Sequence, residues 1–153
     1  MSSLYGQYTT DRLVDNPSNK VPSNAQEGRM RIAYDKYTFT ADAAAADTIG
    51  MGKLPKGARV IGYWLKCGSL DASGGTVDFG YAASSDAVEA ANDDAFLANA
   101  DVTSAVTFDH TSQANMVGLG KAFDAEVELQ IKIEGDTDTT TGTVETCVFY
   151  VVD

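Results

Sequence analysis

The residues that could carry out catalysis in this chain are one histidine, two cysteines and a large set of carboxylates. The histidine, His110, lies in the polar stretch 109–113, and no nucleophile motif such as G-x-S-x-G accompanies it. A catalytic triad would need a nucleophile beside this imidazole, and the sequence gives no sign of one. No glycine-rich phosphate-binding motif is present either. We therefore predict a protein that is not an enzyme and that binds no cofactor.

The acidic stretch 136–145 comes closest to a metal site. Asp136, Asp138 and Thr140 match the first three ligand positions of a calcium loop. The glycine required at position six is absent, because Gly142 is seventh, and Glu145 stands at position ten instead of twelve. This loop is where calcium would bind if anywhere, but the spacing predicts no metal site.

The two cysteines, Cys67 and Cys147, fall in two separate expected strands. They have no C-x-x-C spacing and no nearby histidine pair, which argues against a zinc site. A single disulfide between them is one option, but we expect two buried free thiols.

The chain carries a net charge of −11, which is unevenly distributed. Residues 1–29 contain three basic and three acidic residues, whereas residues 30–153 contain eight basic and nineteen acidic residues. An acidic body repels phosphate backbones and anionic lipid heads, so we predict no nucleic-acid partner and no membrane partner. No apolar stretch has the length of a membrane-spanning helix or the pattern of a signal peptide, so we expect synthesis in a cytoplasm.

Residues 1–29 differ from the remainder of the chain. This segment is polar, contains two of the three prolines, and has apolar residues that follow neither a helical nor a strand period. We predict an extended N-terminal arm over residues 1–29 and a folded domain over residues 30–153. The arm is either a disordered tail or a segment that becomes ordered against a partner.

Period-2 alternation recurs through the domain and predicts about eight strands. The expected strands cover residues 31–40, 47–54, 58–67, 76–81, 102–108, 115–122, 126–134 and 143–152. Regularly spaced short strands with turn signals predict an all-β fold, an antiparallel β-sandwich of jelly-roll type.

One segment interrupts this pattern and predicts a short inserted helix. Ser85 or Asp86 would cap a helix that runs to Ala98, because Asp86 and Glu89 have capping-box spacing. The buried face of this helix would consist of Val88, Ala91, Ala95 and Phe96.

Two of the expected strands differ in the polarity of their two faces. In residues 126–134, Val127, Leu129, Ile131 and Ile133 alternate with polar residues, which predicts one core face and one solvated face. Residues 58–67 are apolar on both sides, which predicts a strand covered on both faces with Trp64 packed in the core. The search for a partner surface therefore centres on the arm and on this strand.

The stretch DTIGMGKLPKGARVIGYWL at residues 47–65 resembles small virion structural proteins of tailed bacteriophages, namely capsid decoration or cement proteins. The strand TVDFGY at 76–81, followed by the Ala- and Asp-rich segment 86–98, extends the resemblance, which covers roughly residues 30–153. It implies a jelly-roll domain, commonly a homo-trimer, that binds the major capsid protein. It also implies a location on the capsid surface of a virion, after synthesis in the host bacterial cytoplasm.

Under this interpretation the arm cements the shell. Its apolar residues would be buried against the shell, and its basic residues would pair with shell carboxylates. The predicted partner-binding residues are Leu4, Tyr5, Tyr8, Arg12, Leu13, Val14, Lys20, Arg29 and Arg31.

Two other functions fit the same sequence. A tail or fibre component of the virion is the nearest alternative. A carbohydrate-binding β-sandwich module is the other, and it would require exposed, coplanar aromatic rings among Tyr34, Tyr37, Tyr63, Trp64 and Tyr81.

Overall fold

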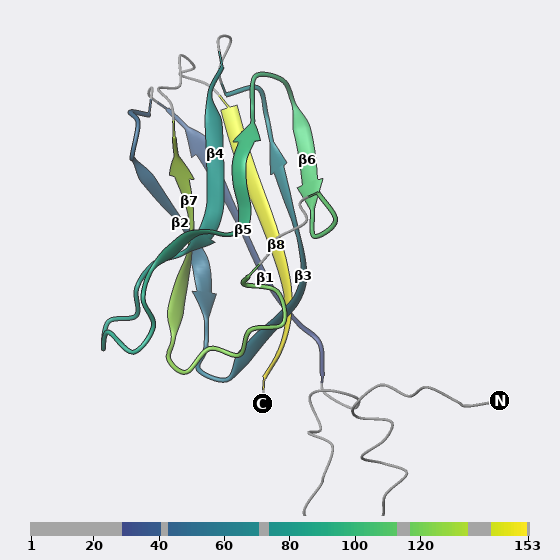
Figure 1. Ribbon diagram of the computed structural model, residues 1–153. Coiled ribbons are helices and arrows are strands. Elements are labelled where there is room, and N and C mark those ends of the chain that lie inside the picture. Colours follow the sequence, from purple (N-terminus) through teal and green to yellow (C-terminus); the bar gives the residue numbers. More distant parts are fainter. Residues whose placement is uncertain (1–28, 41–42, 71–73, 113–116, 135–141, 153) are drawn as a thin grey trace, which may run out of the picture.

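The structure is a computed structural model, and it describes residues 29–40, 43–70, 74–112, 117–134 and 142–152. Within these ranges eight strands form two four-stranded antiparallel sheets that pack face to face as a sandwich (Figure 1). The strands are β1 Arg31–Phe39, β2 Thr48–Leu54, β3 Ala58–Cys67, β4 Thr76–Tyr81, β5 Asn92–Asp101, β6 Val106–Asp109, β7 Val127–Ile133 and β8 Gly142–Val152.

The strand order follows a simple pairing rule. One sheet has the order β1-β8-β3-β6, which we call sheet A, and the other has the order β2-β7-β4-β5, which we call sheet B. Each strand of the first half pairs antiparallel with its counterpart counted from the end: β1 with β8, β2 with β7, β3 with β6 and β4 with β5. The fold is therefore the all-β antiparallel sandwich that the sequence predicts.

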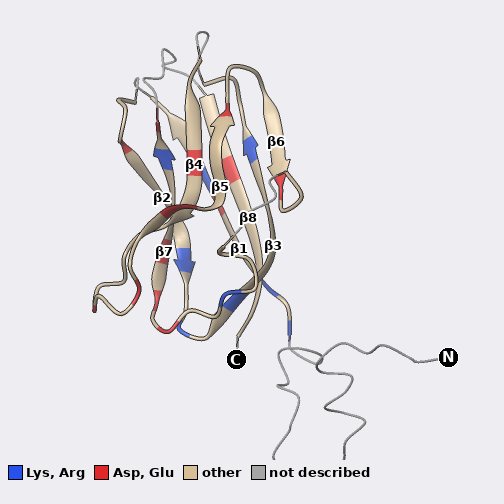
Figure 2. Ribbon diagram, in the orientation of Figure 1, with Lys and Arg blue, Asp and Glu red and all other residues tan. Residues whose placement is uncertain are grey.

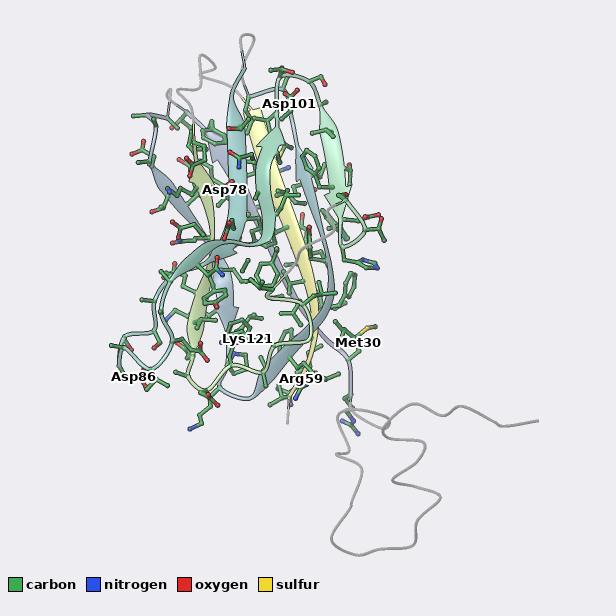
Figure 3. All side chains as sticks on the ribbon, in the orientation of Figure 1. Met30, Arg59, Asp78, Asp86, Asp101 and Lys121 are labelled. Carbon is green, nitrogen blue, oxygen red and sulfur yellow. The ribbon has the colours of Figure 1, made fainter. Side chains whose placement is uncertain are left out.

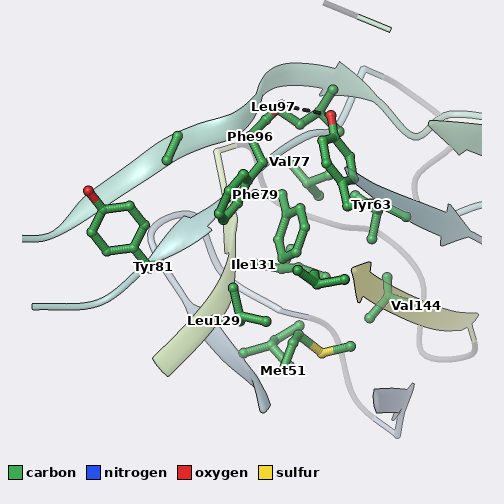
Figure 4. Packing of buried hydrophobic residues seen from close by; sticks show 14 of the residues in the cluster. Met51, Tyr63, Val77, Phe79, Tyr81, Phe96, Leu97, Leu129, Ile131 and Val144 are labelled. Carbon is green, nitrogen blue, oxygen red and sulfur yellow. Dashed lines mark hydrogen bonds between the residues drawn. The ribbon is translucent and has the colours of Figure 1, made fainter. Parts of the chain in front are cut away.

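The core lies between the two sheets and is built by alternating side chains (Figure 4). In β7 the predicted set of Val127, Leu129, Ile131 and Ile133 is buried, while Glu128 is exposed, which confirms the predicted core face. An aromatic cluster fills the centre: the Phe96 ring has its centroid 5.2–6.3 Å from those of Tyr63, Phe79 and Tyr81, and Tyr63 and Phe79 are 5.5 Å apart. Sheet A and sheet B thus share one continuous apolar interior.

Tyr63 connects the two sheets by a polar contact inside this interior. Its hydroxyl donates a 2.7 Å hydrogen bond to the carbonyl oxygen of Phe96 on β5, as Figure 4 shows. Burial, with a smaller contribution from the charge of Asp109, raises the pKa of Tyr63 to about 12. The folded protein therefore favours the neutral form of this phenol.

We expect this phenol to make the protein alkali-sensitive. The pKa of Tyr63 in the folded protein lies above its unfolded value of about 10. The contribution of Tyr63 to the unfolding free energy is therefore fully present below pH 10 and is lost as pH rises from 10 toward 12. Wild type should lose on the order of 2 kcal/mol more unfolding free energy than Tyr63→Phe over this window. Urea unfolding at pH 8 to 12 measures the difference. Parallel curves for the two proteins would contradict this assignment.

The predicted helix over residues 85–98 is wrong. None of the described residues lies in a helix, and Asn92–Asp101 forms β5. Asp86 does act as a cap, but of a turn, because its Oδ1 accepts hydrogen bonds from Ser84 Oγ and from the Val88 N–H. Val88, expected on the buried helix face, is 58% exposed.

Three other strand predictions need correction. The strand expected at 102–108 is shorter and later, since β6 is Val106–Asp109. Of the strand expected at 115–122, the described residues 117–120 form a turn, and Ala122 makes one isolated bridge to Arg59. Trp64 is half-buried and points away from the core, because β3 has only one face between the sheets.

Candidate interaction surface

The outer face of sheet A carries large apolar side chains where a sandwich normally meets water. On β1, Ile32 and Tyr34 are each 57% exposed, and Met30, one alternation step earlier, is 60% exposed and projects beside the start of β1 (Figure 3). Ile61 on β3 is 45% exposed at a bulge. We call the set Met30, Ile32, Tyr34, Ile61, Trp64 and Phe149 the aromatic face.

Strand pairing brings these side chains into rows across β1, β8 and β3. Ile32 lies opposite Phe149, which lies opposite Gly62. A Cβ added at Gly62 would be 3.6 Å from His110 Nδ1 and 3.8 Å from Phe149 Cδ2, so an imidazole and a phenyl ring flank the space above the glycine. His110 therefore lies on the border of this face.

The next row has Cys147 at its centre. Tyr34 and Trp64 are its two cross-strand neighbours, and their ring centroids are 6.1 Å apart. Cys147 itself is only 6% exposed. Two aromatic rings thus cover a cysteine that the strand alternation directs away from the core.

The two cysteines lie on opposite faces of sheet A, since Cys67 belongs to the core cluster. The backbone of sheet A therefore lies between the two sulfur atoms, which rules out a disulfide. Both cysteines are free and buried, as predicted. Burial raises the pKa of Cys67 to about 12 and also raises the pKa of Cys147. Burial therefore favours the protonated, less reactive form of both thiols.

The outer face of sheet B has a different chemistry. Gln130 and Lys132 of β7 point outward, and Asp93 binds both, with Gln130 Nε2 at 2.5 Å and Lys132 Nζ at 3.4 Å. The four strands of sheet B hold two lysines and five acidic residues, a net charge of −3. The strands of sheet A hold four basic and three acidic residues, a net charge of +1. The apolar side of the sandwich is thus also its less acidic side.

Charge is also polarised along the strands. We call the end at which β1 begins the arm end; it carries Arg29, Arg31, Lys53, Lys56, Arg59 and Lys121 against Asp86, Glu89, Asp124, Glu126 and Glu128. Figure 2 shows blue segments at this end, including the start of β3. The other described charged residues are three lysines and nine acidic residues, a net charge of −6. An approaching surface would therefore meet least negative charge at the arm end.

A partly buried ion pair, with a buried Glu89, holds a loop in place at the arm end. Glu89 accepts hydrogen bonds from Lys121 Nζ at 2.6 Å and from the Asp124 N–H at 2.7 Å. The Lys121 ammonium also lies 5.4 Å from the centroid of the Phe123 ring. Burial would raise the pKa of Glu89, but the hydrogen bonds from Lys121 and Asp124 outweigh it and lower that pKa. The loop between β4 and β5 is thereby fastened to the segment before β7.

We expect Glu89→Gln to lower the unfolding free energy by about 2 kcal/mol at pH 7, because Lys121 loses its charged partner. Because the pKa of Glu89 is lowered in the folded protein, its carboxylate stabilises the fold at pH values above the unfolded pKa of about 4.3. This contribution to the unfolding free energy is lost as pH falls through the folded pKa. The difference from wild type should therefore shrink in acid. Urea denaturation at pH 7 and pH 3 measures both quantities.

The same substitution at Glu126 is the matched control. Its pair with Lys53 has the same chemistry at 3.0 Å, but the two side chains are 60% and 63% exposed. Glu126→Gln should change stability by less than about 0.5 kcal/mol. Equal effects at the two positions would contradict the anchoring role of Glu89.

Two of the nine predicted partner-binding residues fall in the described part of the chain. Leu4, Tyr5, Tyr8, Arg12, Leu13, Val14 and Lys20 lie outside the described residues. Arg29 and Arg31 are described, and both are exposed at the arm end, next to Met30. The Asp136 loop also lies outside the described residues.

The part of the chain that the structure describes holds no group of three or more His, Cys, Asp or Glu side chains placed to bind a metal ion. No helix long and apolar enough to cross a membrane occurs in it.

Structural comparison finds the same fold in chains from two phage capsid structures. A chain of the Cyanophage Pam1 capsid asymmetric unit superposes with a TM-score of 0.65 at 20% identity, covering 92% of this chain and 99% of that chain. A chain of the capsid of Ralstonia phage GP4 superposes with a TM-score of 0.63 at 19% identity, covering 88% and 90%. No protein-family model matches the sequence, and no curated protein matches it. The likeness is one of fold across nearly the whole chain.

Proposed function

We propose that this chain is a structural, non-enzymatic component of a bacteriophage head, a decoration or cement protein on the outer surface of the shell. The observation that carries the proposal is the fold shared, over 92% and 88% of this chain, with chains of two phage capsid structures. The strand order supports the jelly roll as a finer classification, because pairing of the first strand with the last and of the second with the seventh is the arrangement expected of that fold.

The proposed partner is the major capsid protein, and the proposed assembly is a homo-trimer. The N-terminal arm, residues 1–29, would contact the shell with its apolar and basic residues. The polarity of charge supports this orientation, since the arm end has a net charge of +1 and the remaining described charges sum to −6. A protein that binds only the assembled shell stabilises it by mass action.

The described surface does not favour carbohydrate binding. Tyr63 and Tyr81 are buried at 1% and 5% exposure. The exposed pair Tyr34 and Trp64 is tilted by 58°, so the two rings do not form one flat platform for a sugar. No comparable observation supports this alternative.

Co-sedimentation with undecorated capsids tests the proposed function. We expect the full chain to pellet with capsids and to raise the temperature at which they release their contents. A chain lacking residues 1–29 should lose this binding, and Arg29→Ala with Arg31→Ala should weaken it. Lys66→Ala, a basic residue of sheet A that lies away from the arm end, is the control and should bind normally. Absence of binding by the full chain, or full binding without the arm, would overturn the proposal.

A further inference from the structure

The aromatic face is unusual because its large apolar side chains are left uncovered by the described part of the chain. Seven large apolar residues are exposed among the described residues, and four of them, Met30, Ile32, Tyr34 and Ile61, belong to this face. Contiguous apolar surface on a soluble protein commonly marks a contact site. None of these seven exposed residues belongs to a strand of sheet B, whose outer face carries polar contacts among Asp93, Gln130 and Lys132.

The chain itself contains a segment suited to this face. Residues 1–28 join the body at Arg29, and the next residue, Met30, is part of the face. Tethering at the edge of a site gives a segment an effective concentration in the millimolar range, provided it can reach. Twenty-eight residues can extend to roughly 90 Å, whereas a nine-residue strand such as β1 covers about 30 Å. The segment is therefore long enough to turn back and cross the whole face.

The composition of residues 1–28 also suits a contact with the aromatic face. The segment has apolar residues but no core of its own, and these are Leu4, Tyr5, Tyr8, Leu13, Val14 and Val21. Residues 1–28 hold two basic and three acidic residues, a net charge of −1. The strands of sheet A have a net charge of +1, and Arg29 adds another positive charge at the point of attachment. Charge therefore favours this contact weakly, whereas it would oppose packing on the acidic outer face of sheet B.

We propose that in the unbound protein the N-terminal segment, residues 1–28, packs its apolar side chains across the aromatic face of its own chain. The contact would cover Ile32, Tyr34 and Trp64 and would keep both apolar surfaces out of water. The inference concerns the free protein and does not depend on the proposed function. If the segment also binds a shell, the shell competes with the aromatic face for the same side chains.

Trp64 makes this proposal directly measurable, because it is the only tryptophan and lies in the face. The test compares the full chain with a full-length variant carrying Leu4→Ser, Tyr5→Ser, Tyr8→Ser, Leu13→Ser and Val14→Ser. We expect the acrylamide quenching constant of Trp64 to rise about twofold in the variant as the segment leaves the face, and its emission to shift to longer wavelength. Circular dichroism checks that both proteins keep the sandwich.

Matched controls separate this effect from a general change. A full-length variant with Gln7→Ser, Asn16→Ser, Asn19→Ser and Asn24→Ser alters polar positions of the same segment and should quench like wild type. Cys147 lies beneath Tyr34 and Trp64, so its reaction with a thiol reagent should accelerate in the apolar-to-serine variant. Cys67, inside the core, should stay protected.

Three outcomes overturn the proposal. Equal quenching and equal Cys147 reactivity in the wild-type and apolar-to-serine chains would mean that the segment does not cover the face. Protection of Trp64 in wild type that disappears on dilution would assign the cover to a second copy of the chain. An equal increase in the polar control would mean that the apolar side chains are not responsible. Because capsids are absent from these measurements, their failure is distinguishable from failure of the shell-binding proposal.

Discussion

Replacing Phe96 with alanine is expected to lower the unfolding free energy by about 3–5 kcal/mol. Phe96 is fully buried, and its ring centroid lies 5.9 Å from Tyr63, 5.2 Å from Phe79 and 6.3 Å from Tyr81. Removing this ring leaves a cavity between three aromatic neighbours that are fixed by their own strands. Urea unfolding monitored by circular dichroism measures the loss.

Val88→Ala is the matched control for this prediction. A helix over residues 85–98 would bury Val88 and Phe96 on one face, whereas in the structure Val88 is 58% exposed. We therefore expect Val88→Ala to change stability by less than about 0.5 kcal/mol. Similar losses in the two variants would contradict β5 and restore the helical interpretation.

Gly80→Ala is expected to destabilise the protein by about 3 kcal/mol, although it adds a single methyl group. A Cβ at Gly80 would collide with the Asn92 carbonyl oxygen and lie 2.6 Å from the carbonyl oxygen of Asp93. Both atoms belong to the backbone of β5, so no side-chain rotation can relieve the contact. Relief requires that β4 and β5 move apart, which would weaken their pairing.

Gly68→Ala provides the comparison, because a Cβ there would have its nearest neighbour, the Thr143 nitrogen, at an ordinary 3.4 Å. This variant should stay within about 1 kcal/mol of wild type. Thermal unfolding of the two variants side by side measures the contrast. A Gly80→Ala protein as stable as Gly68→Ala would show that β5 does not approach β4 as closely as the structure has it.

The strands that the sequence predicts best are those with unbroken alternation. In β7, Val127 to Ile133 alternate without interruption, and both the strand and its buried face are confirmed. The turn at Pro55 and Gly57 separates β2 from β3 where expected, and Gly57 has a φ of 79° that glycine adopts readily. The local sequence suffices to predict these strands, because one face of each packs in the core along its whole length.

The helix prediction failed because bulges disturb the alternation of β5. Between Phe79 and Tyr81 the partner positions on β5 jump from Leu97 to Asn92, and Asn99 has a φ of 50°. Three consecutive residues, Ala95 to Leu97, are buried as a result, so β5 lacks the period-2 alternation from which a strand is predicted. The irregularity is stabilised from another strand, since Asp78 accepts a 2.6 Å hydrogen bond from the Asn99 N–H. The spacing of residues within 85–101 does not predict this hydrogen bond, because its acceptor lies in β4.

The interaction surface was predicted only in part. The apolar character of both sides of residues 58–67 is visible in the sequence, and it indicated a covered strand. The structure places β3 between β8 and β6, so that Ile61 and Trp64 lie on an outer face with Tyr34 of β1. Which apolar side is core depends on sheet order, and sheet order comes from pairings such as Trp64 with Cys147, 83 positions apart. Charge polarity along the sandwich depends on the same pairings.

Location of the chain in its native particle tests the central claim most directly. A cryo-electron microscopy map of the virion should show this eight-stranded sandwich on the outer surface of the head, with the arm end and residues 1–29 against the major capsid protein. The strongly acidic opposite end should face solvent. The same sandwich found only in the tail or in a fibre, or seated on the head with its acidic end against the shell, would contradict the account.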